Sequence, residues 1–262
     1  MHLLSLSTFT FCVFIPTLTS AQAPAQNGPA AVTPNVSAST EYSDVIYSPS
    51  AKTTPEVFRS VVQLEIAVKE NDQEEASIRY ADAVVISKDG LMACVFAKPN
   101  SHLDKASIES VDLLMLDGTA AAAKVLAVDP AHGLALFQVN EPNLSPMELS
   151  SRSLVAKRRL NWHAVYRQGQ KTILYSRPLQ VHRARLKIGN SDDFCQVIDS
   201  ASSALTADRS GSALVALDGT LVALMGRQPH WDVSPKSVRP RTKVAHAVPA
   251  SVIRQLVDTT MK

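Results

Sequence analysis

The pattern of hydrophobic and polar positions changes near Pro55. From there on, apolar residues gather in short runs rich in Val, Ile and Leu, and each run ends at residues that favour turns. Runs of this length and composition predict β-strands. The first group of expected strands covers 57–68, 77–87, 91–96, 111–116, 120–128 and 134–139. The second group covers 162–166, 172–179, 181–188, 195–198, 212–217, 221–225 and 244–248.

Tight turns connect several of these runs. Lys88-Asp89-Gly90 and Asp117-Gly118 lie between expected strands, and glycine can take the positive φ that a hairpin turn needs. About a dozen short strands in two groups predict an all-β fold of two six-stranded antiparallel β-barrels. We place the N-terminal barrel at 55–145 and the C-terminal barrel at 146–248.

The chain ends in a segment with helical periodicity, expected to occupy 249–262. Apolar side chains share one helical face, which predicts a helix that packs on a core. They are Val252, Ile253, Leu256 and Val257.

The N-terminal region has a different texture. Residues 1–21 contain a short apolar run followed by small residues, which is typical of a secretory signal peptide. The run is too short for a membrane span of about 20 residues, so no transmembrane segment is expected after cleavage, although an uncleaved anchor stays open. Residues 22–54 are rich in Ala, Pro and Ser and predict a disordered linker. The protein is therefore expected to be exported, either periplasmic or secreted.

Composition and cysteine usage narrow the picture. The chain has 262 residues, a formal net charge of +2 and 45% hydrophobic residues, so any binding of a polyanion must depend on a local cluster of charge. Loss of Cys12 with the signal peptide would leave Cys94 and Cys195, both in apolar strand-like segments, where a free buried thiol is favoured over a disulfide. No cofactor is expected, and no Cys and His spacing indicates a metal site.

Several segments point to one family of folds. Their order and spacing are similar to the strands and turns of bacterial trypsin-like serine proteases of the HtrA type, and this resemblance implies the two-barrel fold. The segments are 83–90 (AVVISKDG), 113–118 (LLMLDG), 123–130 (AKVLAVDP), 213–219 (ALVALDG) and 247–249 (AVP). No PDZ-like domain is expected after the terminal helix, so the resemblance does not extend to the regulatory and oligomeric architecture of full-length HtrA proteases.

The same resemblance assigns the catalytic positions, and most of them are altered. Ser210, in the segment Asp208-Arg209-Ser210-Gly211-Ser212, takes the position of the nucleophile. Ala97 takes the position of the histidine base, Gly133 that of the orienting aspartate, and Asp208 that of a glycine of the oxyanion hole. Loss of the base leaves about 10³ to 10⁴ of rate acceleration over water, and loss of an oxyanion donor removes roughly a further 10² to 10³.

A histidine elsewhere could replace the missing base. His132 lies beside Gly133 and His102 lies five residues after Ala97, but both are expected to be solvated loop residues. His246 replaces a phenylalanine of the family and is expected to pack in the core. Ser210 can equally be a turn residue without catalytic function.

A second candidate site is a basic segment. Residues 149–191 contain no Asp or Glu and carry ten Lys and Arg residues. Arg183, Arg185 and Lys187 alternate along an expected strand, so they should share one face. With Lys157, Arg158 and Arg159 they could bind a polyanion. The competing interpretation is a solvated strand face, and the loop 227–243, with Trp231, could extend the patch.

These observations favour a catalytically inactive trypsin-like pseudoprotease that acts as a binding or scaffold module for a protein or peptide partner of unknown identity. One alternative is an active serine endopeptidase that uses Ser210 with a relocated base. The other is a polyanion-binding surface protein that uses the basic segment.

Overall fold

The structure is a computed structural model that describes residues 45–47, 59–69, 75–115, 119–141, 144–168, 171–199, 210–226 and 243–262. The chain divides into two units, Met1–Ser39 and Thr40–Lys262, and every described residue belongs to the second. The expected signal peptide, most of the expected linker, Asp208 and the loop with Trp231 lie outside the described residues.

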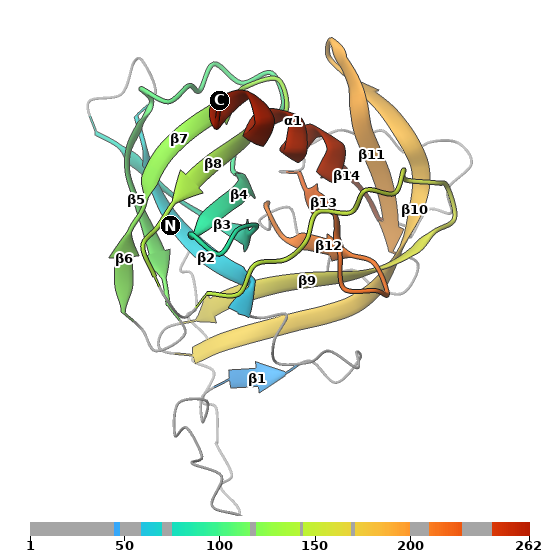
Figure 1. Ribbon diagram of the computed structural model, residues 1–262, viewed down its shortest axis with the longest axis horizontal. Helices are drawn as coiled ribbons and strands as arrows, with labels where there is room; N and C mark the ends of the chain where they lie inside the picture. The colour runs from blue at the N-terminus through green and yellow to red at the C-terminus, as the bar shows by residue number, and fades with distance from the viewer. Residues whose placement is uncertain are drawn as a thin grey trace, which may run out of the picture. The chain divides into compact units, whose positions relative to one another are not determined.

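The N-terminal barrel is a curled antiparallel sheet with the strand order β6-β5-β2-β3-β4-β8-β7 (Figure 1). Its strands are β2 (Val61–Val68), β3 (Ser77–Val85), β4 (Leu91–Val95), β5 (Ile108–Leu114), β6 (Ala120–Ala122), β7 (Lys124–Asp129) and β8 (Leu134–Gln138). Only Ala123 separates β6 from β7, so one bent stretch pairs with β5 through its first part and with β8 through its last. This bend joins the two ends of the curled sheet.

The C-terminal barrel is closed by six strands. They are β9 (Arg159–Gln168), β10 (Lys171–Ile188), β11 (Ser191–Asp199), β12 (Ala213–Val215), β13 (Leu221–Met225) and β14 (Lys243–Pro249). Hydrogen bonding runs in the order β10-β11-β14-β13-β12-β9, and β9 pairs with β10 again to close the barrel. The two runs expected at 172–179 and 181–188 form the single strand β10. The two-barrel fold predicted from the sequence is confirmed.

A short strand lies inside the segment that was expected to be disordered. Strand β1 (Val45–Tyr47) pairs in parallel with β10, with Ile46 opposite Ile173. The reason is geometric: the pairing of β11 with β10 extends only from Gln180 to Ile188, which leaves the first half of β10 with an open edge on that side. An open strand edge presents unpaired N–H and C=O groups that accept another strand, and these three residues of the expected linker occupy it.

Three hydrophobic cores are formed by the residues that the structure describes. One fills the N-terminal barrel, one fills the C-terminal barrel, and one lies between the barrels and includes Val252 and Ile253 of helix α1 (Ala250–Thr260). Strand β4 shows why its sequence is continuously apolar: Leu91, Ala93 and Val95 face the shared core, whereas Met92 and Cys94 face the barrel interior. A strand that is buried on both faces has no polar alternation.

The two cysteines lie in different barrels. Cys94 belongs to the core of the N-terminal barrel and Cys195 to that of the C-terminal barrel, and both are free and buried. Burial raises the pKa of Cys195 to about 12 and, together with the nearby charge of Asp82, holds the pKa of Cys94 well above its ordinary value. Both thiols are therefore protonated and act as small apolar side chains.

Candidate functional site

Ser210 lies in a loop that is anchored to the N-terminal barrel. Its backbone carbonyl accepts a hydrogen bond of 2.9 Å from the N–H of Asp82 in β3, and only 4% of the residue is exposed. Gly211 has φ +86°, and a Cβ there would lie 1.7 Å from the carbonyl oxygen of Asp82. The loop can therefore approach β3 this closely only with glycine after Ser210.

The residue after this glycine continues the anchoring. Ser212 is fully buried, and its Oγ accepts a hydrogen bond of 2.6 Å from Trp162 Nε1. The guanidinium of Arg177 lies over the Trp162 ring, 4.7 Å from its centroid. The carboxylate of Asp82, which is 3% exposed, accepts the backbone N–H of Val165 at 3.3 Å. Buried polar contacts between the two barrels thus fix the position of the Ser210 loop.

Ala97 and Gly133, which the resemblance assigns to the base and its orienting carboxylate, are in direct backbone contact. The N–H groups of Phe96 and Ala97 both donate to the carbonyl of Gly133, at 3.0 and 3.3 Å. Gly133 has φ +65°, and a Cβ at this position would lie 2.2 Å from the carbonyl oxygen of Ala97. The backbone therefore leaves no room for any side chain at residue 133.

His132 differs from the expectation of a solvated loop residue. It is only 8% exposed, and its ring lies against Phe194 with 5.0 Å between the centroids. Its Nδ1 lies 2.6 Å from Asp129 Oδ2, and its Nε2 lies 3.0 Å from Ser191 Oγ. The turn before β8 is pressed between the two barrels, which removes the side chain from solvent.

The other two histidines that the sequence analysis considered, His102 and His246, lie as it expected. His102 is exposed on a loop. His246 is 5% exposed and packs edge-on against Phe194, with 5.5 Å between the ring centroids. Among the hydrogen bonds of the described residues, none joins a histidine nitrogen to Ser210 Oγ.

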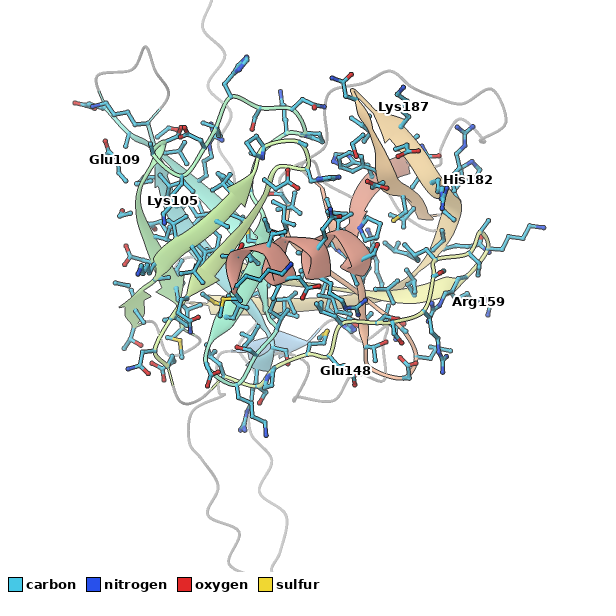
Figure 2. All side chains as sticks on the ribbon, turned by 45° about the horizontal axis from the view of Figure 1, so that its top comes forward. Lys105, Glu109, Glu148, Arg159, His182 and Lys187 are labelled. Atoms are coloured by element: carbon cyan, nitrogen blue, oxygen red, sulfur yellow. The ribbon has the colours of Figure 1, made fainter. Side chains whose placement is uncertain are left out.

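The basic segment forms a surface of the C-terminal barrel. Arg183, Arg185 and Lys187 are all exposed, whereas Ala184 and Leu186 between them are partly buried, so the predicted alternation along β10 is present. Figure 2 labels Lys187 and His182 on β10 and Arg159 at the start of β9.

The stretch 157–159 lies beside this strand. The N–H of Lys157 donates to the carbonyl of Val181 at 2.7 Å, and the N–H of Val181 donates to the carbonyl of Arg158 at 2.9 Å. The fold therefore brings both parts of the predicted basic site together. Asp192 and Asp193, which are exposed on the neighbouring strand β11, add negative charge next to it.

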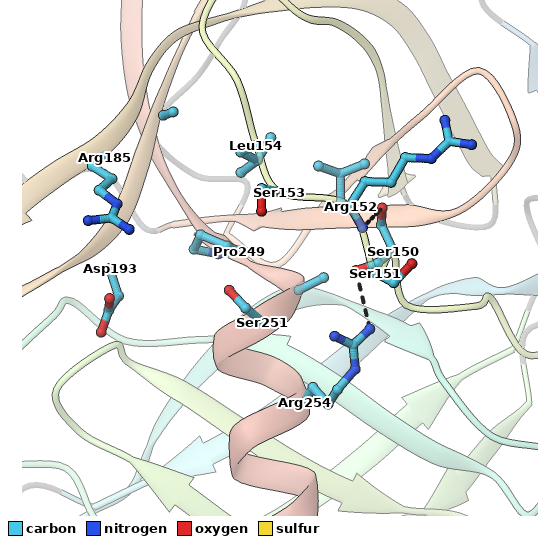
Figure 3. A pocket seen from close by; sticks show the side chains of 13 residues that line it. Ser150, Ser151, Arg152, Ser153, Leu154, Arg185, Asp193, Pro249, Ser251 and Arg254 are labelled. Carbon is cyan, nitrogen blue, oxygen red and sulfur yellow. Dashed lines mark hydrogen bonds between the residues drawn. The ribbon is translucent and has the colours of Figure 1, made fainter.

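A cavity of about 250 Å³ lies next to this basic surface (Figure 3). Arg152, Arg185 and Arg254 line it, together with a single carboxylate, Asp193, and the first residues of α1. Two of the arginines are held in place: Arg254 donates to the carbonyls of Leu149 and Ser150, both at 3.2 Å, and Arg152 lies 3.6 Å from Asp218. The helix has no acidic residue in its first turn and no side-chain cap, so its first N–H groups add positive potential.

Two of the residues described above were missed by the sequence analysis. Ser191 follows the turn between β10 and β11, and Arg254 lies on the terminal helix. Neither belongs to a motif, and each gains its neighbours only through packing between distant segments. Among the described residues, no cluster of His, Cys, Asp and Glu fits a metal ion, and no helix has the length and apolar character needed to span a membrane.

Comparisons with known proteins identify the family of this fold. The family model of the trypsin-like peptidase domain matches residues 81–224. The active form of the Rv3671c protease from M. tuberculosis superposes with a TM-score of 0.55, covering 90% of this chain and 94% of that one. The identity is 13%, so this similarity shows the fold alone. No curated protein sequence matches. Since the family model spans more than half of the chain and includes the Ser210 loop, the chain belongs to the trypsin-like peptidase domain family.

Proposed function

We propose that the chain is an exported pseudoprotease whose trypsin-like fold acts as a binding or scaffold module and whose Ser210 site does not hydrolyse peptides. The backbone contact between Gly133 and Ala97 carries this proposal. A trypsin-like mechanism needs a base and a carboxylate at these two positions. Neither residue has an ionisable side chain, and the 2.2 Å approach of a Cβ at Gly133 to the Ala97 oxygen leaves no space for one.

The surroundings of Ser210 support the same conclusion. A relocated base would have to bring a histidine nitrogen within hydrogen-bonding distance of Ser210 Oγ. One candidate from the sequence, His132, has both ring nitrogens directed to other partners, Asp129 and Ser191. His102, the other candidate, is exposed on its loop. The alternative of an active endopeptidase therefore has less support than an inactive Ser210 site.

Mapping of a serine-reactive probe tests the proposal. The protein is incubated with a fluorophosphonate and digested with trypsin, which separates Ser210 in the peptide 210–227 from Ser191 in the peptide 188–209. We expect no adduct on Ser210 and no hydrolysis of unfolded casein above that of the Ser210→Ala variant. An adduct on Ser210, together with casein hydrolysis that the variant loses, would show an active peptidase.

Export rests on the apolar run within residues 1–21. We expect the mass of the secreted protein to correspond to a chain that begins at Gln22. Retention of the full N-terminus on the membrane fraction would instead indicate an uncleaved anchor.

The basic surface favours a second candidate function, the binding of an anionic group. Three arginines and a single aspartate line the cavity, and the first residues of α1 line the same space. Guanidinium groups bind carboxylates and phosphates through paired hydrogen bonds, so the shared chemistry of the ligand is a carboxylate or phosphate oxygen. The exposed side chains of Arg183 and Lys187 could extend this contact along a polyanion.

Retention on a heparin column tests this second function. Combined substitution of Arg183, Arg185 and Lys187 by Ala should lower the salt concentration at which the protein elutes. Binding with fewer cationic side chains releases fewer counterions from the polyanion and is therefore weaker. The matched control replaces Lys69, Lys88 and Lys124, three exposed lysines of the N-terminal barrel, by Ala and changes the net charge equally. Equal shifts for both triple variants would mean that only net charge matters and would exclude a site on β10.

A further inference from the structure

A chain of three side chains connects the two barrels, and none of the three stands at a position that the resemblance assigns to the catalytic triad. Asp129, at the end of β7, holds His132 Nδ1 at 2.6 Å, and His132 Nε2 lies 3.0 Å from the Oγ of Ser191, at the start of β11. This is the connectivity that activates a serine in acyl-transfer enzymes: a carboxylate on one ring nitrogen and the hydroxyl on the other. Such a site is recognised by its geometry and not by its place in the sequence.

Local structure holds the first two members in place. Asp129 Oδ1 accepts the N–H of Ala131 at 3.0 Å, and the carbonyl of Asp129 accepts the N–H of His132 at 3.3 Å. The ring of Phe194 lies against the His132 ring. The imidazole is therefore fixed by a carboxylate, a hydroxyl and an aromatic ring.

The charge on Asp129 determines which ring nitrogen carries the proton. Burial raises the pKa of the Asp129 carboxyl, but the hydrogen bond and charge of His132 and the N–H of Ala131 outweigh this effect and hold the pKa below its ordinary value. An ionised carboxylate can only accept, so Nδ1 donates to it. When the ring carries a single proton, Nδ1 holds it and Nε2 accepts the Ser191 hydroxyl, as a general base requires.

Ser191 is placed where a small molecule can reach it. The residue is partly exposed, and its neighbours Gly189, Asn190, Asp192 and Asp193 are all exposed. Its Oγ also accepts the N–H of Asp193 at 3.4 Å, which orients the side chain at the end of the hairpin turn.

We propose that Ser191 is a nucleophile for acyl transfer from activated esters, with His132 as its base and Asp129 as the positioning residue. This inference goes beyond the proposed function and is independent of Ser210. In the first step, Ser191 Oγ bonds to the ester carbonyl carbon while its proton moves to His132 Nε2. The leaving alcohol takes that proton as its bond to the carbon breaks. Water then attacks the acyl group and gives a proton to His132, which returns it to Ser191 as the acid leaves.

The substrate class follows from what surrounds Ser191. An oxyanion hole contributes roughly 10² to 10³ to the rate of acyl transfer, but the N–H of Asp193 is already bonded to Ser191 Oγ itself, at 3.4 Å. We therefore expect reaction with electrophiles that have good leaving groups, such as p-nitrophenyl esters and fluorophosphonates. Amide bonds, which have poor leaving groups, should stay intact.

The mapping experiment with a fluorophosphonate decides this proposal. In the wild-type protein, phosphorus should bond to Ser191 Oγ with loss of fluoride, which gives an adduct in the tryptic peptide 188–209. The adduct should disappear in Ser191→Ala. The rate of labelling should fall at least about tenfold in His132→Gln and Asp129→Asn, because the base or its correct tautomer is lost.

Two controls separate catalysis from structure. His102→Gln removes an exposed histidine, and Ser210→Ala removes the other candidate serine; both should leave the labelling of Ser191 unchanged. A folded wild-type protein without an adduct on Ser191 would overturn the proposal, as would labelling that His132→Gln does not slow. The three side chains would then serve only to join the barrels.

The outcomes also distinguish the two proposals. An adduct on Ser210 alone contradicts both the proposal of an inactive Ser210 site and the proposal that Ser191 is a nucleophile. Absence of any adduct contradicts only the Ser191 nucleophile. An adduct confined to Ser191 supports both.

Discussion

At the scale of single residues, Gly133 shows how closely the backbone packs at a position that the resemblance assigns to the orienting carboxylate. Here the backbone has a positive φ and closes against Ala97. The carbonyl of Gly133 also accepts two backbone hydrogen bonds, from Phe96 and Ala97. An aspartate at residue 133 would therefore disrupt this backbone packing.

Gly133→Ala should destabilise the protein more than Gly219→Ala. Gly219 has φ +86°, and no atom lies within 4 Å of the place that a Cβ would take, so alanine there costs only the positive φ, about 1–2 kcal/mol. At Gly133 the methyl group would also meet the Ala97 oxygen at 2.2 Å. Urea unfolding of both variants at pH 7 measures the difference. Equal losses in the free energy of unfolding would show that the backbone contact gives way easily.

At the scale of elements, the sequence predicted well the strands that are buried on both faces. β4 and β13 are apolar throughout because both of their faces are buried, and α1 packs with the face that its periodicity indicated. The errors occur where pairing depends on a distant partner. β10 continues through two expected strands because β9 pairs along its first half and β11 along its second half. β1 exists because β10 leaves an edge open.

At the scale of the whole molecule, the three cores bury ionisable groups, and this predicts how stability depends on pH. Burial lowers the pKa of both His163 and His246 from 6.5 to about 4. Between these values the unfolded chain binds protons that the folded protein does not. The contribution of these two histidines to stability should therefore be constant above about pH 7 and fall as the pH decreases toward 4, by roughly 1.4 kcal/mol per pH unit for each histidine.

His246→Phe should reduce this slope by about half, because one of the two buried histidines is removed. Free energies of unfolding in urea at several values between pH 7 and pH 5 give the slope, and comparison of slopes cancels any change in packing. The exposed His102 provides the control, since His102→Gln should leave the slope as it is. Asp129, whose pKa is lowered from 3.8, acts below this window. An unchanged slope in His246→Phe would contradict the buried neutral state of His246.

The sequence by itself determined the class of fold, most of the strands, the packing face of the terminal helix and the absence of ionisable side chains at Ala97 and Gly133. These features depend on local periodicity and on the identity of single residues. Only the tertiary structure decided that Gly133 closes against Ala97, that β1 completes the edge of β10, and that His132 meets Ser191, 59 positions further along the chain. Each of these contacts depends on strand register and on packing between distant segments, which no local pattern in the sequence encodes.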